Sequence, residues 1–260
     1  MPIPAGGAAS YSAPMCVLAL AWRAHPRWRL VAAGNRDELH ARPALPLARW
    51  AEPVGVIAGR DAVGGGTWLG VNEAGRFVVV TNLRGFGAPD PGKASRGALV
   101  TDVLAGKDAA AIDLAAFNPF NLIAIDGERP AYLTNRPEAA RAALAPGMHG
   151  LSNGLRDEPW PKTRQLQAAV ADWLAVDDAD IAPLFDALRD ERVPVGDQAD
   201  DDEREPVASP VFIRNPVYGT RCSTVVTVDA DGNGLIAERR FDAAGDVTGE
   251  ARLAFRWPEI

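Results

Sequence analysis

A cysteine stands at the start of the first strand-like segment of this chain. Cys16 follows Met15 and opens an apolar run over residues 17–22. If Cys16 is the first residue of the mature protein, its own α-amino group lies beside its thiol. That amine titrates near ~8 and the thiol near ~8.5, so the amine can accept the thiol proton and later return it to a leaving group. Cys16 is therefore a candidate nucleophile that needs no histidine.

Four polar residues near the ends of predicted strands could complete such a site. Asn35 and Asp37 follow the strand that is expected to pair with the Cys16 strand, so the hairpin should return them close to Cys16. Asn82 ends a β-branched run, and Asn153 ends a short strand. A carboxylate can bind an α-ammonium group, and side-chain amides can donate to an oxyanion. We expect these four residues to converge on the sulfur.

Each of these residues also has a simpler interpretation. A cysteine in an apolar strand is often just buried, and asparagine at a strand end often caps a turn. The sequence contains no G-x-S-x-G, H-E-x-x-H, C-x-x-C or P-loop signature. The residues alone leave open a hydrolase, a binding protein and a structural domain in which Asp37 merely holds a hairpin.

Apolar alternation and helical spacing predict hairpins at both ends of the chain with helices between them, an α+β fold of antiparallel sheets. Gly34 is expected to break the second strand, and residues 39–53 to be extended or loop-like. The strands are expected at residues 16–22, 28–33, 54–58, 67–71, 76–82, 120–125, 131–134, 149–153, 220–228, 234–241 and 251–257. The helices are expected at residues 96–104, 137–144, 163–174 and 181–188. We interpret residues 15–260 as one domain behind a disordered or non-native extension, residues 1–14.

Composition limits the classes of function. The formal net charge of −7 argues against nucleic acid as the main partner, because phosphate binding needs clustered Lys and Arg. Two cysteines in 260 residues favour a reduced, cytoplasmic location over a disulfide scaffold. No apolar run approaches the ~20 residues needed to cross a bilayer. The acidic segment 197–205 is typical of a solvated loop. Oligomeric state is not predicted.

Several motifs together resemble one known family. They are Met15-Cys16, the segment 33–43 that contains Asn35-Arg36-Asp37-Glu38, the segment 65–75 that begins Gly-Gly-Thr-Trp, Thr81-Asn82, the segments 151–154 and 159–162, and the segment 218–224. This combination is similar to the NRDE family, the bacterial and eukaryotic homologues of transport and Golgi organisation protein 2. The resemblance runs from Met15 nearly to the C-terminus.

That family is in turn similar to the N-terminal-nucleophile amidohydrolases of the bile-salt hydrolase and penicillin V acylase group. The resemblance implies a four-layer αββα fold and hydrolysis of a C–N bond without a required cofactor. It implies Cys16 as nucleophile, Asp37 as the partner of its amine and Asn82 with Asn153 as oxyanion donors. Arg221 would be the basic residue late in the site, and Asn35 and Arg36 are further candidates for substrate binding.

Two features depart from the acylase pattern. The acylases carry an arginine three positions before the aspartate, where this chain has Gly34. Arg36 is a possible substitute, although in an extended segment it would face away from Asp37. The chain also has residues ahead of Cys16, so the expected mechanism requires that translation begins at Met15 or that the chain is cleaved before Cys16. We favour a start at Met15, followed by removal of that methionine.

The family also suggests a non-catalytic alternative. Its eukaryotic members are associated with secretory-pathway organisation, mitochondrial metabolism and haem movement. A pocket of the same fold that had lost hydrolysis could bind haem or another small molecule. Cys16 or a histidine would then be the candidate iron ligand, since thiolate and imidazole both bind haem iron.

Overall fold

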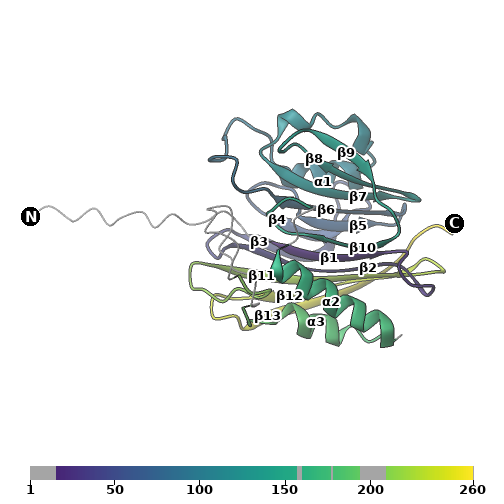
Figure 1. The fold of residues 1–260 in the computed structure, drawn as a ribbon. Helices are drawn as coiled ribbons and strands as arrows, with labels where there is room; N and C mark the ends of the chain where they lie inside the picture. Colours follow the sequence, from purple (N-terminus) through teal and green to yellow (C-terminus); the bar gives the residue numbers. More distant parts are fainter. Residues whose placement is uncertain (1–15, 157–159, 177, 194–208, 260) are drawn as a thin grey trace, which may run out of the picture.

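The computed structural model describes residues 16–156, 160–176, 178–193 and 209–259 (Figure 1). Two sequence-based predictions, the extension at 1–14 and the acidic loop at 197–205, lie outside the described residues. Within the described residues, the strands form two antiparallel sheets, which we call sheet A and sheet B.

Sheet A contains six strands in the spatial order β10-β1-β2-β11-β12-β13. Their bounds are β1 Val17–Trp22, β2 Trp28–Leu39, β10 Gly147–Leu151, β11 Tyr218–Asp229, β12 Asn233–Phe241 and β13 Val247–Arg256. The central strands β2 and β11 have 12 residues each. Strand β1 therefore lies between β10 and β2, so the Cys16 end of β1 has a neighbour on both sides.

Sheet B contains seven strands that follow one another in chain order, from β3 to β9. Their bounds are β3 Ala44–Arg49, β4 Ile57–Asp61, β5 Leu69–Asn72, β6 Arg76–Asn82, β7 Phe120–Asp126, β8 Arg129–Thr134 and β9 Ala140–Ala143. Each strand is antiparallel to the next, and the connections β5–β6 and β7–β8 are short turns. Such up-and-down order follows from consecutive hairpins.

Helices cover the outer face of each sheet (Figure 1). The helices α2 Pro161–Val176 and α3 Ala182–Leu188 pack on sheet A, where Leu166, Val170 and Leu184 meet Val31 and other apolar residues of the sheet. Helix α1 Arg96–Leu104 and the 3₁₀ turns Ala109–Ala111 and Leu114–Ala116 pack on sheet B. A third apolar core lies between the two sheets. The predicted four-layer αββα arrangement is thereby confirmed.

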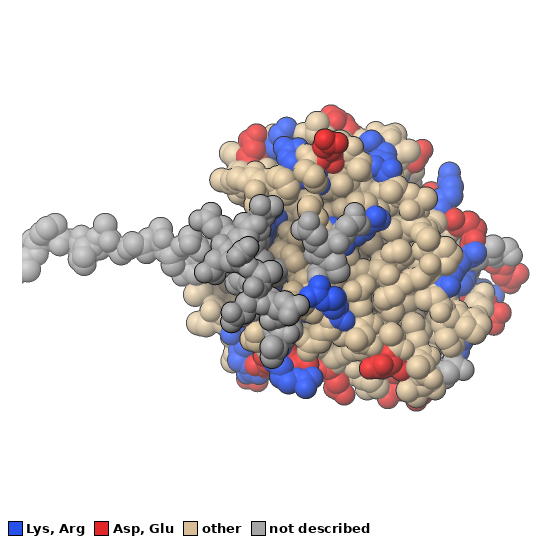
Figure 2. Space-filling model, viewed as in Figure 1, with Lys and Arg blue, Asp and Glu red and all other residues tan. Residues whose placement is uncertain are grey.

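The surface carries interspersed charge. Acidic and basic side chains alternate over the face shown in Figure 2, between larger areas of uncharged residues. Among the described helices, none is long and apolar enough to cross a membrane.

Two local predictions from the sequence differ from the structure. Residues 137–144 do not form a helix: Ala140–Ala143 is strand β9, because pairing with β8 outweighs the helical propensity of alanine. The segment 39–53, predicted to be extended or loop-like, contains the extended strand β3. Gly34 does not interrupt β2, since it pairs with Leu18 on one side and Thr224 on the other.

Close packing explains the glycine at position 34. A Cβ atom built there would lie 2.8 Å from the carbonyl oxygen of Val17 and 3.0 Å from the ring of Trp68. The indole of Trp68, which directly precedes β5 of sheet B, occupies the space that a side chain at position 34 would need. No arginine fits at this position without displacing β1 or Trp68.

We therefore expect Gly34→Ala to lower the free energy of unfolding by about 1–3 kcal/mol through overpacking. Part of that loss should be recovered when Trp68→Leu is added, because the smaller side chain makes room for the methyl group. Urea unfolding of the two single variants and the double variant measures this coupling. Strict additivity of the two losses would show that Trp68 does not exclude a side chain at position 34.

Candidate active site

One cavity of about 790 Å³ opens where the ends of the two sheets meet the beginning of α1. It receives residues from β2, β11 and β12 of sheet A and from β4 and β6 of sheet B. Both cysteines of the chain line it. The lining includes Cys16, Arg36, Trp68, Asn82, Arg96 and Cys222.

Cys16 is held from both sides of β1. Its carbonyl oxygen accepts a hydrogen bond of 2.8 Å from Ser152 Oγ, and the backbone N–H of Asp37 donates to its sulfur. Burial, followed by the charge of Asp37, raises the pKa of the Cys16 thiol to about 12, while Arg36 acts in the opposite direction. The thiol is therefore protonated at neutral pH unless a nearby base removes its proton.

Asp37 is fully buried on the face of sheet A that packs against the helices. Thr220 Oγ1 donates a hydrogen bond of 2.6 Å to its Oδ1, whereas Oδ2 has no hydrogen-bond partner among the described residues. Burial raises the pKa of Asp37 to about 7, opposed first by the charge of Lys162. One carboxylate oxygen is thus left for a further donor, and an α-ammonium group at Cys16 would be suitable.

Asn35 does not reach the sulfur, contrary to the sequence-based expectation. It is two residues from Asp37 on the same strand, so its side chain also points toward the helices. Its Nδ2 donates to the carbonyl oxygens of Leu188 and Val211 at 2.8 and 2.9 Å, and its Oδ1 accepts from Ser223 Oγ at 2.7 Å. These bonds fasten the end of α3 and the 211 segment to sheet A.

The two other asparagines lie together, but only one lines the cavity. Asn82 is partly exposed there. Asn153 is fully buried, and its Nδ2 donates to the backbone carbonyl of Asn82 at 2.7 Å, while its own carbonyl accepts from Arg84 N–H at 2.9 Å. Asn153 therefore fixes the backbone at Asn82 and is not among the residues that line the cavity.

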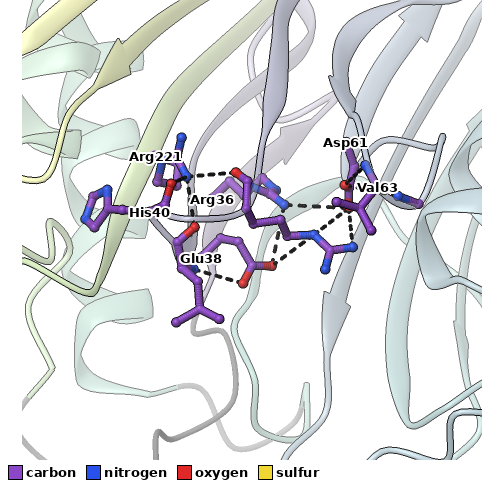
Figure 3. A network of polar contacts seen from close by, with 9 residues as sticks. Arg36, Glu38, His40, Asp61, Val63 and Arg221 are labelled. Atoms are coloured by element: carbon purple, nitrogen blue, oxygen red, sulfur yellow. Dashed lines mark hydrogen bonds and ion pairs between the residues drawn. The ribbon is translucent and has the colours of Figure 1, made fainter.

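Charged residues from β2, β4 and β11 form a network at the rim of the cavity (Figure 3). Arg36 lies 3.5 Å from Glu38 and 3.9 Å from Asp61, and Asp61 also accepts two bonds from Arg42. Arg221 Nη1 donates to the carbonyl oxygens of Leu39, His40 and Arg42 at 2.8–3.0 Å. Arg36 thus shares the face of Cys16, and Arg221 holds the turn that follows β2.

Two basic residues near the site were not identified as site residues from the sequence. Arg96, the first residue of α1, lines the cavity. Among the nearby charges, a thiolate at Cys16 would raise the pKa of Arg96 the most. Lys162, in the first turn of α2, is 1% exposed, with Nζ 3.3 Å from Ser209 Oγ. Lys162 belongs to a motif that marked the family resemblance, but nothing in the sequence placed it beside Asp37.

The described residues contain no cluster of three or more His, Cys, Asp or Glu side chains that could hold a metal ion. The functional groups that line the cavity include two thiols, side-chain amides, carboxylates and several guanidinium groups. Together they define the site of a four-layer αββα protein with a buried cysteine between the ends of its two sheets.

The sequence model of the family described as "Transport and Golgi organisation 2" matches residues 15–243. The human transport and Golgi organization protein 2 homolog is 33% identical over 258 residues, covering 86% of this chain and 92% of the human protein. The Drosophila melanogaster transport and Golgi organization protein 2 is 30% identical over a matched region that covers 58% of this chain and 62% of the Drosophila protein. The chain belongs to the transport and Golgi organisation 2 family.

Two solved structures are similar at low sequence identity. One is the Caenorhabditis elegans orthologue of N-acylethanolamine-hydrolyzing acid amidase, with a TM-score of 0.45, 14% identity and coverage of 81% of this chain and 92% of that chain. The other is a mutant conjugated bile acid hydrolase from Clostridium perfringens, with a TM-score of 0.48, 10% identity and coverage of 91% and 92%.

The charge of Lys162 should control the titration of Asp37. The pKa of Asp37 is about 7 in the folded protein and about 3.9 in an unfolded chain. The folded state therefore binds more protons between these values, and the contribution of Asp37 to stability falls as pH rises from about 4 to 7. In Lys162→Met the pKa of Asp37 should rise further, so that this fall extends above pH 7. Lys162→Arg should behave like the wild type.

Urea unfolding between pH 4 and 9 measures this effect, with the same substitutions in an Asp37→Asn background as the reference. The difference between the two backgrounds isolates the Asp37 titration from any packing loss at position 162. An identical Asp37-dependent profile in the wild type and Lys162→Met would show that Lys162 does not act on this carboxyl group.

Proposed function

We propose that this protein is a cysteine hydrolase of C–N amide bonds, with Cys16 as its nucleophile and the α-amino group of Cys16 as its base. The observation that carries this proposal is the position of Cys16. It lies at the wall of a cavity with Asn82, and it lies beside a buried carboxylate, Asp37, which keeps one oxygen free of hydrogen-bond partners among the described residues.

The chemistry follows from these groups. The α-amine takes the thiol proton as the sulfur attacks the substrate carbonyl carbon, and a C–S bond forms. The Asn82 amide stabilises the resulting oxyanion. Collapse of this intermediate breaks the C–N bond, and the α-ammonium group returns the proton to the departing amine. Water then cleaves the thioester by the same route, releasing a carboxylic acid and regenerating Cys16.

A base is needed because the Cys16 thiol does not ionise unaided, and we assign that role to the α-amine. Burial raises the pKa of the thiol to about 12, so its spontaneous ionisation is negligible at neutral pH. None of the three histidines lines the cavity. When Cys16 is preceded by another residue, its nitrogen belongs to a peptide bond and cannot accept a proton. The active form is therefore a chain that begins at Cys16.

The entrance of the cavity favours a substrate with an apolar part. Leu45 and Val63 line it and are 54% and 65% exposed, and Trp68 lies further inside. Burying an acyl chain against these side chains would contribute roughly 0.8 kcal/mol per methylene group. An acyl amide fits this arrangement, with its chain at the entrance and its carbonyl group at Cys16.

A chain that begins at Met15 should lose its methionine and hydrolyse acyl amides, whereas a chain beginning Met-Lys-Cys16 should not. The reason is that the inserted lysine converts the α-amine into an amide. Intact mass verifies each N-terminus, and amine release from p-nitroanilides of increasing acyl length measures activity. Cys16→Ala in the Met15 chain provides the blank. Equal activity in the two chains would rule out the α-amine as base.

Asn82→Ala should lower kcat by ~10²–10³ with little change in KM, because its amide is proposed to act on the oxyanion alone. Asn82→Asp, which keeps the shape but loses the donor, should be equally slow. A rise in KM at unchanged kcat would instead assign Asn82 to substrate binding.

Ligand binding without hydrolysis is the second candidate function, and haem is the ligand to test. Two buried thiols and several apolar residues line the cavity, and the thiolate of Cys16 is the candidate iron ligand. If this function holds, haem titration should give a Soret shift that disappears in Cys16→Ala and persists in Cys222→Ser. A shift that survives both substitutions would be non-specific binding, and the haem proposal would fail.

A further inference from the structure

The proposed hydrolysis places negative charge in a site that opposes it. The thiolate and the oxyanion form where burial disfavours charge and where the carboxylate of Asp37 adds repulsion. A single amide at Asn82 donates to the oxyanion but does not neutralise it. A cation facing the sulfur would therefore lower the energy of both species. The chemical role of such a cation rests on the proposed function, although its effect on the charge of the sulfur is testable without a substrate.

Arg36 is near the sulfur, but its charge is already shared. Its guanidinium lies within ion-pair distance of both Glu38 and Asp61, at 3.5 and 3.9 Å. Both carboxylates also contact Arg42, so the network contains two guanidinium groups and two carboxylates. As a group these four residues are close to neutral. The net positive charge that Arg36 presents to an anion at Cys16 is therefore small.

Position 34 cannot supply the cation. It faces the cavity side of β2, as Arg36 does, but Val17 and Trp68 leave no space for a side chain there. A cation can also reach the cavity from outside sheet A.

Helix α1 brings a guanidinium group to the opposite wall. Its start is pressed against the loop that leads to Trp68: a Cβ on Gly66 would lie 2.4 Å from the carbonyl group of Gly97, and Thr67 N–H donates to Gly97 O at 3.3 Å. This approach sets Arg96 at the cavity wall with Cys16 and Asn82. Arg96 Nη1 donates to Pro119 O at 3.1 Å, which restrains the side chain.

The charge of Arg96 is not cancelled by a neighbour. Among the described residues no carboxylate lies within ion-pair distance of it, in contrast to Arg36 and Arg42. Burial lowers the pKa of Arg96, and a thiolate at Cys16 would oppose this lowering more than any other nearby charge. A partly buried guanidinium without a carboxylate partner is costly, and an anion forming at Cys16 would offset that cost.

We infer that Arg96 is the charge-stabilising residue of this site: its guanidinium compensates the thiolate of Cys16 and then the anionic tetrahedral intermediate formed on it. The segment Gly66-Thr67-Trp68 fixes its position, since the glycine admits α1 and the tryptophan closes the space above Gly34.

Site-resolved alkylation of the thiols tests this inference without any substrate. The purified chain is treated with iodoacetamide between pH 7 and 10, and the labelling rates of Cys16 and Cys222 are read separately by peptide mass spectrometry. The rate follows the thiolate fraction. Arg96→Gln keeps a donor for Pro119 O but removes the charge, and should slow Cys16 alkylation about tenfold at each pH, as expected for a pKa increase of about one unit. Arg96→Lys should stay within about twofold of the wild type.

Two controls limit the interpretation. Arg60→Gln removes another cavity-lining guanidinium, one that stacks on Trp50, and should leave Cys16 labelling unchanged. Burial also raises the pKa of the Cys222 thiol, so Cys222 should be labelled slowly in all variants, and faster labelling of Cys222 in one variant would report a loss of the fold. Equal Cys16 rates in wild type and Arg96→Gln would overturn the inference, as would a wild-type Cys16 that stays unlabelled up to pH 10.

The outcome also separates this inference from the proposed hydrolysis. Slower Cys16 labelling in Arg96→Gln, in a protein that cleaves no amide, would support the role of Arg96 while the hydrolase proposal fails. Loss of amide hydrolysis in Arg96→Gln with unchanged labelling would mean that Arg96 acts elsewhere, and would reject its action on the sulfur.

Discussion

Side-chain alternation along β2 decides which residues reach Cys16. β2 is buried on both faces, so each of its side chains points either toward sheet B or toward the helices α2 and α3. Gly34, Arg36 and Glu38 face the other sheet and the cavity, whereas Asn35 and Asp37 face the helices. The sulfur therefore has guanidinium and carboxylate side chains on its own face. From the opposite face it receives a backbone N–H and the field of a buried carboxyl group.

A second constraint joins the two sheets at the same point. The turn after β10 bonds to both: Ser152 Oγ donates to Cys16 O, Thr81 Oγ1 donates to Ser152 O at 2.6 Å, and Asn153 Nδ2 donates to Asn82 O. Cys16 on sheet A and the Asn82 amide on sheet B are thus positioned by two consecutive residues, Ser152 and Asn153. These buried hydrogen bonds hold the ends of β1 and β6 in place relative to each other.

The sequence predicted the parts of the site that depend on local pattern. The hairpin that pairs residue 17 with Asn35, the strand that ends at Asn82 and helix α1 all follow from periodicity. It could not predict that the Asn153 amide donates to the backbone carbonyl of Asn82, because the two residues belong to different sheets and are 71 positions apart in the sequence. Arg96 was missed for the same reason: on a helix its spacing is that of any surface arginine, and only the contact between Gly66 and Gly97 directs it inward.

That contact links features that are far apart in the chain. Trp68 fills the space above Gly34, so the face of β2 beside the sulfur has no side chain at this position. Position 66, two residues before Trp68, must be glycine, because the start of α1 passes within van der Waals contact of the backbone there. One Gly-Thr-Trp segment therefore has two linked effects. Its tryptophan excludes a side chain at position 34 of β2, and its glycine allows the start of α1, the helix that packs on sheet B, to come close. A larger residue at position 66 would move α1 outward and take the guanidinium of Arg96 with it, although neither Cys16 nor Arg96 had changed.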